Sequence, residues 1–199
     1  MTNLHINSSK YDRQCSQTLF LQFLLLPWPF FGCSFALRTP SKVIFFPPYR
    51  MFSDRQFHHK ILNDKKLKLK YHLLGKIGEG SFGKIYKAIN RSSNRRVALK
   101  IELNPDDNKR SNLALEISVL KKLQGLTGIP QIYHSGKWEY GIFMEMELLC
   151  SSLNDEREKE FSLHEIHMLA VELIQILRRI HEKNIIHQDL KPQNIMRRN

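Results

Sequence analysis

The 199-residue sequence predicts an α+β fold, in which an antiparallel sheet with one inserted helix precedes a mainly helical part. Strand-like runs come first, one helical stretch interrupts them, and a long helix follows. Turn-forming segments separate the runs, namely RSSN at 91–94 and NPDDN at 104–108. The composition, 42% hydrophobic and 25% charged residues, is typical of a globular protein and excludes a wholly disordered chain.

The first part of the predicted domain contains five strands and one helix. The helix lies within residues 109–124, because Leu113, Ile117 and Leu120 recur at helical spacing. The strand-like runs are rich in apolar residues and end at turn-forming residues. They cover residues 71–77, 84–90, 96–103, 131–136 and 141–147.

A long helix is predicted over residues 162–183. Ser162 with Glu165 three positions later is the pattern of a capping box, which marks a helix N-terminus. Apolar residues follow along one stripe, which needs another surface to pack against. These residues are Ile166, Leu169, Ala170, Leu173, Leu177 and Ile180.

The first seventy residues differ from the rest and are predicted to be an extension outside the domain of residues 71–199. Residues 1–70 hold eleven Lys and Arg against three Asp and Glu, so they carry +8 of the formal charge of +12. Within them, residues 19–37 are nearly uncharged and apolar, which leaves three readings open: a membrane anchor, a signal-peptide core, or neither. The lysine-rich residues 60–70 are predicted to be a solvated lead-in to the first strand.

Charge and cysteine content narrow the possible partners. The excess of basic residues lies outside the predicted domain and accompanies no nucleic-acid-binding motif, so no nucleic-acid partner is expected. Cys15, Cys33 and Cys150 are few, odd in number and far apart in the sequence. They predict neither a disulfide framework nor a metal-ligand pair.

Three of the nine glycines, Gly78, Gly80 and Gly83, form the spacing G-x-G-x-x-G. In dinucleotide-binding proteins this spacing opens a helix, but here KIYKAIN continues as a strand. With Ile85 in the following apolar position, the pattern is instead typical of a glycine loop that closes a hairpin over a nucleotide. Glycine allows backbone N–H groups to approach phosphate oxygens. A simple tight hairpin turn is the alternative.

Two charged residues in apolar surroundings are candidate partners. Lys100 ends VALK in the third predicted strand, and Glu116 lies on the apolar stripe of the helix that follows. A carboxylate on that face needs a partner, because an unpaired buried charge is costly. We therefore expect a Lys100–Glu116 pair, which could hold the lysine against phosphates. Two separate exposed charges are the alternative.

The segment IIHQDLKPQN, residues 185–194, is the strongest chemical signal. Asp189 could accept the proton of an attacking hydroxyl, and Lys191 could steady a transferred phosphoryl group. Asn194 could bind a magnesium ion through its amide oxygen. Phosphoryl transfer needs few protein groups, because positioning and charge neutralisation do most of the catalysis.

Residues 71–199 resemble a eukaryotic protein kinase, with residues 71–149 as the N-terminal lobe and residues 150–199 as the start of the C-terminal lobe. The residues that carry the resemblance are IGEGSFGKIY, VALK, Glu116 and HQDLKPQN. The sequence looks closest to the casein kinase I family. That likeness rests on GEGSFGKIYKA, VALKIE, LQGLTGIPQIYHSG, MELL followed by SSL, and HEKNIIHQDLKPQNIM.

The resemblance implies a role for each matching residue. Asp189 and Lys191 would be catalytic, and Asn194 would bind Mg²⁺. Met146 would be the gatekeeper, and Glu147 to Leu149 would form the hinge that meets adenine. The full nucleotide-binding set would be Ile77, Gly78, Gly80, Ser81, Gly83, Ile85, Ala98, Lys100, Glu116, Met146, Glu147 and Leu149.

Three departures from the family pattern stand out. Gln188 replaces the usual arginine, which argues against control through a phosphate on the activation loop. CSSL at 150–153 replaces the usual GPSL, so the ribose side of the nucleotide site is expected to differ. The sequence stops at Asn199, before the D-F-G motif that would follow roughly a dozen residues later.

The implied function is an ATP-dependent, Mg²⁺-dependent serine/threonine kinase of casein kinase I type. Its expected substrates are protein Ser and Thr hydroxyls near acidic or phosphorylated residues, and its expected location is cytoplasmic or nuclear. Because the D-F-G aspartate is missing, the alternative is a catalytically inactive module that binds nucleotide or a partner. A membrane-anchored kinase that uses residues 19–37 is a further alternative.

Overall fold

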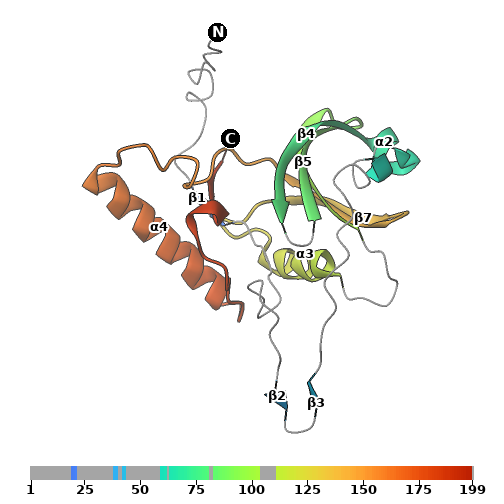
Figure 1. The fold of residues 1–199 in the computed structure, drawn as a ribbon. Helices are drawn as coiled ribbons and strands as arrows, with labels where there is room; N and C mark the ends of the chain where they lie inside the picture. Colours follow the sequence, from blue (N-terminus) through green and yellow to red (C-terminus); the bar gives the residue numbers. More distant parts are fainter. Residues whose placement is uncertain are drawn as a thin grey trace, which may run out of the picture.

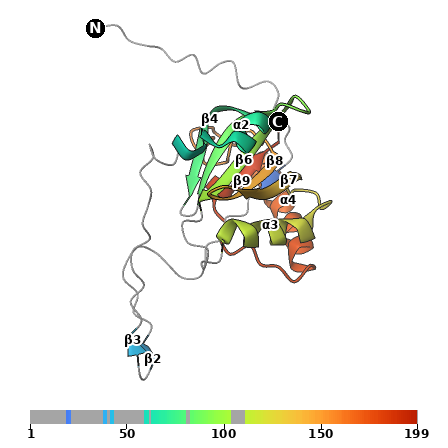
Figure 2. The ribbon, with the colours of Figure 1, turned by 90° about the vertical axis from the view of Figure 1, so that its right-hand side faces the viewer.

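The computed structural model describes residues 19–21, 38–39, 42–43, 59–61, 63–80, 83–103 and 111–198. A five-stranded sheet forms one part of the molecule, helix α3 (Asn112–Leu123) lies along it, and helix α4 (Leu163–His181) lies on the other side of α3 (Figure 1). The α+β fold class is therefore confirmed. The view turned by 90° shows α3 and α4 below the sheet (Figure 2).

The sheet is antiparallel throughout, with the strand order β4-β5-β6-β8-β7. Buried and half-buried residues alternate along β5, whereas seven consecutive residues of β6 are buried, as expected of a strand covered on both faces. The strands are β4 (Tyr71–Gly80), β5 (Gly83–Asn90), β6 (Arg95–Leu103), β7 (Ile132–Trp138) and β8 (Gly141–Glu147). The five predicted strands are thus present, and β4 runs three residues further than expected, to Gly80.

Each face of the sheet has its own apolar core. On one face the core joins the sheet to α3 and α4, with Leu113, Met144 and Ile180 among its buried members. On the other face, Tyr86 and Leu99 pack with residues that precede the sheet. The sheet is therefore the layer that both cores share, and α3 is fixed to it by the first core.

Residues 59–61, 63 and 65–70 are helical, the last range being α2 (Lys65–Lys70), which corrects the expectation of a solvated lead-in. Asp64 is the N-cap of α2, and its carboxylate accepts a hydrogen bond from the Leu67 amide at 2.7 Å. Leu67 and Ile61 are buried in the second core. Most of the lysines are exposed as expected, but the leucine between them anchors the helix.

Helix α4 has the predicted capping box: Ser162 and Glu165 exchange hydrogen bonds between side chain and backbone. The predicted apolar stripe is buried to different degrees. Ile180 is buried in the first core, Leu169, Leu173 and Leu177 are half-buried against it, and Ile166 is 51% exposed. Ile176, which the predicted stripe did not include, is also buried.

A short strand from the N-terminal extension pairs with a strand near the end of the chain. β1 (Leu19–Leu21) is fully buried and lies antiparallel to β9 (Ile195–Arg197). The Leu19 amide also donates to the Glu172 carboxylate at 2.9 Å, and the Leu21 amide to the Gly128 carbonyl at 2.8 Å. The domain boundary at Tyr71 stays a prediction, but two residues before it, Leu19 and Leu21, are part of the first core.

Most of the apolar segment 19–37 lies outside the described residues. Among the residues that the structure describes, no helix is long and apolar enough to cross a membrane. β2 (Arg38–Thr39) and β3 (Lys42–Val43) form a separate two-stranded hairpin. Cys150 is disulfide-bonded. The sequence did not predict this bond, because pairing depends on the distance between cysteines in the fold and not on their spacing in the sequence.

Candidate active site

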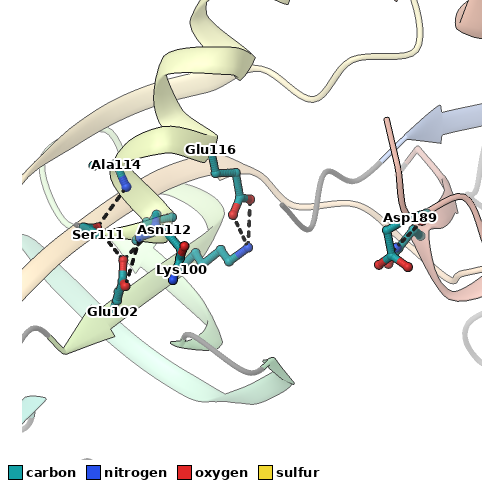
Figure 3. A network of polar contacts seen from close by, with 9 residues as sticks. Lys100, Glu102, Ser111, Asn112, Ala114, Glu116 and Asp189 are labelled. Carbon is teal, nitrogen blue, oxygen red and sulfur yellow. Dashed lines mark hydrogen bonds and ion pairs between the residues drawn. The ribbon is translucent and has the colours of Figure 1, made fainter. Parts of the chain in front are cut away.

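Lys100 on β6 and Glu116 on α3 form the expected ion pair (Figure 3). The Lys100 Nζ lies 2.6 Å from one carboxylate oxygen of Glu116 and 2.8 Å from the other. The two side chains are only 7% and 5% exposed. The pair is therefore both buried and bidentate, which fixes the position of the ammonium group.

Burial and the Lys100 ammonium shift the pKa of the Glu116 carboxyl in opposite directions. Burial raises the pKa of Glu116, because removal from water disfavours the charged form. The Lys100 ammonium lowers this pKa, and the nearby Glu102 carboxylate raises it again. The resulting pKa lies above the ordinary value, so the ionised state of Glu116 depends on Lys100.

Four predicted nucleotide-binding residues lie on one face of the sheet. Ile85 is directly opposite Lys100, and Ala98 is directly opposite Met146. Residues opposite each other on antiparallel strands share a face, and so do residues two apart on one strand. Lys100 and Ala98 are two apart, so Ile85, Lys100, Ala98 and Met146 share the face that α3 covers.

The glycine-rich segment is the end of the β4–β5 hairpin, with Gly80 paired to Gly83, while Ser81 lies outside the described residues. A Cβ atom on Gly83 would lie 2.4 Å from the Ile101 carbonyl oxygen. The same atom on Gly78 would make ordinary contacts with Ile85, the nearest at 3.5 Å. The packing of the strands therefore requires glycine at position 83. It does not require glycine at position 78, where the close approach of a ligand would explain the glycine better.

The predicted hinge residues have several structural contacts of their own. The Glu147 carboxylate accepts hydrogen bonds from Arg198 Nε at 2.7 Å and from the Gln131 amide at 3.2 Å. The Glu147 amide donates to the Gln131 carbonyl at 2.8 Å. Leu149 is buried, whereas Ile77 is 52% exposed on β4. The Glu147 side chain therefore ties β8 to neighbouring chain segments, a role that the sequence did not indicate.

The predicted catalytic residues converge on one carboxylate. Asp189 Oδ2 lies 2.9 Å from Lys191 Nζ and accepts a hydrogen bond of 2.8 Å from Asn194 Nδ2. The same amide group also donates to the Asp189 carbonyl at 2.8 Å. The short 3₁₀ helix η2 (Pro192–Asn194) turns the chain so that Asn194 returns to Asp189. Gln188 has φ +65°, a left-handed conformation that completes the tight loop.

Known proteins with similar sequences indicate the family of this chain. A family model for the protein kinase domain matches residues 71–199, which is most of the chain. The chain belongs to the protein kinase family. Its kinase domain is 36% identical over 132 residues to a probable serine/threonine-protein kinase of Dictyostelium discoideum, which covers 64% of the chain and 26% of that protein.

A second relative is Casein kinase I homolog 2 of Schizosaccharomyces pombe. It is 35% identical over 129 residues, which cover 63% of the chain and 29% of that protein. The resemblance to serine/threonine kinases and to a casein kinase I protein is thus confirmed. The chain spans less than a third of the length of either relative.

The loop that carries Asp189, Lys191 and Asn194 offers hard oxygen atoms of the type that Mg²⁺ prefers. Asn194 is 1% exposed, and its amide nitrogen is occupied by two bonds to Asp189, which leaves the side-chain oxygen as the acceptor. The residues that the structure describes contain no cluster of three His, Cys, Asp or Glu side chains that could hold a metal. The Asn194 side chain therefore has one oxygen atom of the kind that could act as a metal ligand.

Sequence reasoning missed one buried residue of the kinase domain, Glu102. It lies two positions after Lys100 on β6 and is 5% exposed. Its carboxylate contacts the first turn of α3 (Figure 3). The available signal was VALKIE itself, because residues two apart on a strand face the same side.

Proposed function

We propose that the chain is an ATP-dependent serine/threonine protein kinase domain of casein kinase I type, which transfers the γ-phosphoryl group of ATP to Ser or Thr hydroxyls. The observation that carries this proposal is the Asp189 carboxylate, whose Oδ2 oxygen contacts both Lys191 and Asn194. An oriented carboxylate beside a cation is what proton acceptance and charge neutralisation require.

Asp189 is the group that orients the substrate hydroxyl and accepts its proton as the oxygen attacks the γ-phosphorus. Its side chain is 14% exposed, so it remains accessible while it is held in place. Lys191, which is 41% exposed, neutralises charge on the transferred phosphoryl group. The bond from phosphorus to the β-phosphate oxygen breaks as the new P–O bond forms, and ADP leaves.

Lys100 binds the α- and β-phosphate oxygens, and Glu116 keeps its ammonium group in place. Asn194 would hold Mg²⁺, which would neutralise negative charge on the phosphates when bound. Backbone N–H groups of the glycine segment, which includes Gly78, Gly80 and Gly83, cover the phosphates, and Ser81 belongs to the same proposed nucleotide-binding set.

Adenine is placed against the face formed by Ile85, Ala98 and Met146. Ile77 covers it from β4, and the backbone of Glu147 and Leu149 meets its edge. Because Ile77 is half exposed, it is free to contact a bound base.

The proposed substrates are Ser and Thr side chains of proteins, near acidic or phosphorylated residues, in the cytoplasm or nucleus. The observation behind this finer statement is the likeness to Casein kinase I homolog 2. Relative rates on matched peptides with and without acidic neighbours test it.

The main experiment measures MgATP binding by calorimetry and transfer of labelled γ-phosphate to an acidic protein. Asp189→Asn should abolish transfer and retain nucleotide binding. The matched control is Asp64→Asn, which changes a buried aspartate to another good N-cap residue in α2, and it should leave both properties intact.

The possible outcomes separate the two candidate functions. Transfer that depends on Asp189 supports the kinase. MgATP binding without transfer by the wild-type chain supports the alternative, an inactive nucleotide- or partner-binding module. Absence of both contradicts the proposal.

A further inference from the structure

Glu102 is a buried carboxylate whose bonds all go to one place, the N-terminus of α3 (Figure 3). The residue is 5% exposed and belongs to β6, not to the helix. Its carboxylate oxygens accept three hydrogen bonds from the start of the helix. The donors are the Ser111 hydroxyl at 2.5 Å, the Asn112 amide at 3.2 Å and the Leu113 amide at 2.7 Å.

These bonds complete the first turn of α3. The initial N–H groups of a helix have no partner within the helix. Glu102 takes the first two of them, and the Ser111 hydroxyl takes the third, from Ala114, at 3.0 Å. The first turn of α3 contains no acidic residue of its own, so Glu102 supplies the negative charge that favours a helix N-terminus.

Glu102 and Lys100 together attach α3 to β6 at two points. The two residues lie on the same face of the strand, about 6.6 Å apart along it. Their partners, Asn112 and Glu116, are four residues apart on the helix, or about 6 Å along its axis. Two separate contacts therefore join β6 to α3, one at the first turn of the helix and one about a turn later.

We propose that Glu102 is a positioning residue, which fixes the first turn of α3 on β6 and thereby holds the Glu116 carboxylate against Lys100. Without Glu102 the first turn of α3 would lose its hydrogen bonds to β6, and Leu113 in the first core and the Lys100–Glu116 pair would be the attachments left near this end. A small rotation of the helix would then lengthen bonds that are now 2.6 and 2.8 Å. The inference rests on the proposed function, because the Lys100 ammonium matters as a phosphate ligand.

The first test replaces Glu102 by Gln, which keeps the shape but loses the charge. Hydrogen exchange of the Asn112 and Leu113 amides should become at least about tenfold faster, as expected when hydrogen bonds to a charged group are weakened. Because Glu116 would then hold the Lys100 ammonium less firmly, the dissociation constant for MgATP should rise about five- to tenfold. Unchanged exchange at these amides would overturn the proposal.

Glu145→Gln is the matched control. Glu145 is also a buried glutamate of the sheet, but it is directly opposite Leu99 and so lies on the other face. It accepts hydrogen bonds from the Tyr71 hydroxyl at 2.7 Å and from Asn90 Nδ2 at 2.8 Å. This variant should leave α3 exchange and MgATP affinity unchanged, and equal effects in both variants would overturn the positioning role.

The second test combines Glu102→Gln with Glu116→Gln. If Glu102 acts through Glu116, the loss of Glu102 should have little further effect on MgATP affinity once Glu116 is neutral. Additive effects would show that Glu102 only stabilises the fold, and would overturn the proposal. Should Glu102→Gln fail to fold, Ser111→Ala removes one of the three donors and must cause a smaller change in the same direction.

A separate readout keeps this inference distinct from the kinase function. The NMR signal of the Lys100 ammonium reports its contact with Glu116 without any nucleotide. Glu102→Gln should shift this signal in the same direction as Glu116→Gln does, even if the wild-type chain fails to bind MgATP. An unmoved Lys100 signal would overturn the positioning role, whereas absence of MgATP binding would contradict the kinase proposal alone.

Discussion

Substitution of Lys100 by Met is expected to destabilise the fold strongly. Methionine has similar length but no charge, so Glu116 would remain at 4% exposure without its cation. Removal of one partner from a buried ion pair costs about 3–5 kcal/mol. The variant also loses two hydrogen bonds between charged groups, at 2.6 and 2.8 Å. At about 1.5–3 kcal/mol for each bond, their loss predicts a destabilisation of similar size.

The destabilisation should depend on pH. Burial already raises the pKa of Glu116, and the Lys100 ammonium is the main group that lowers it. Its removal therefore raises the folded-state pKa further above the unfolded value. A group with a raised folded pKa contributes stability at low pH and loses it as the pH rises through that pKa. The deficit of Lys100→Met should thus be small in acid and large at neutral pH.

Urea denaturation followed by circular dichroism, at pH 5 and at pH 8, measures this difference. The control is the double variant Lys100→Met with Glu116→Leu, which removes both charges and should recover most of the stability. A deficit below about 1 kcal/mol, or one that is equal at both pH values, would refute the reasoning, because a buried unpaired carboxylate must titrate.

Two further predictions concern the glycine segment and α4. Gly83→Ala should destabilise the ligand-free protein by about 1–3 kcal/mol, because the new Cβ overlaps the Ile101 carbonyl. Gly78→Ala should weaken only nucleotide binding. Thermal denaturation without nucleotide measures the difference between the two variants. Ser162→Ala should cost about 1 kcal/mol of stability. The hydrogen bonds from Ser162 hold the pKa of Glu165 below its usual range, so loss of the hydroxyl should raise it, which a carboxyl NMR titration would show.

Local patterns predicted the elements that local chemistry controls. The apolar spacing of Leu113, Ile117 and Leu120 marked α3, and Ser162 with Glu165 marked the start of α4. The Lys100–Glu116 contact could be expected because a carboxylate on an apolar stripe needs a cation. In each case, the residue types alone restricted the structure.

Contacts between distant segments could not be predicted in this way. The pairing of Leu19–Leu21 with β9 joins residues more than 170 positions apart, and three apolar residues carry no signal for their partner. Lysines dominate the composition of α2, which concealed that one leucine, Leu67, is buried. Glu102 appeared as an ordinary charge on a strand, because its donors become neighbours only when α3 folds back on β6.

The antiparallel register of β1 and β9 determines how the molecule would respond to mechanical force. Leu19 lies opposite Arg197, and Leu21 lies opposite Ile195. A force that separates the chain before Leu19 from the chain after Arg197 therefore acts on one end of this ladder and opens it like a zipper, one pair at a time. Ile195, directly after Asn194, belongs to the last pair to open, so the loop that ends at Asn194 would be released only after the rest of the strand.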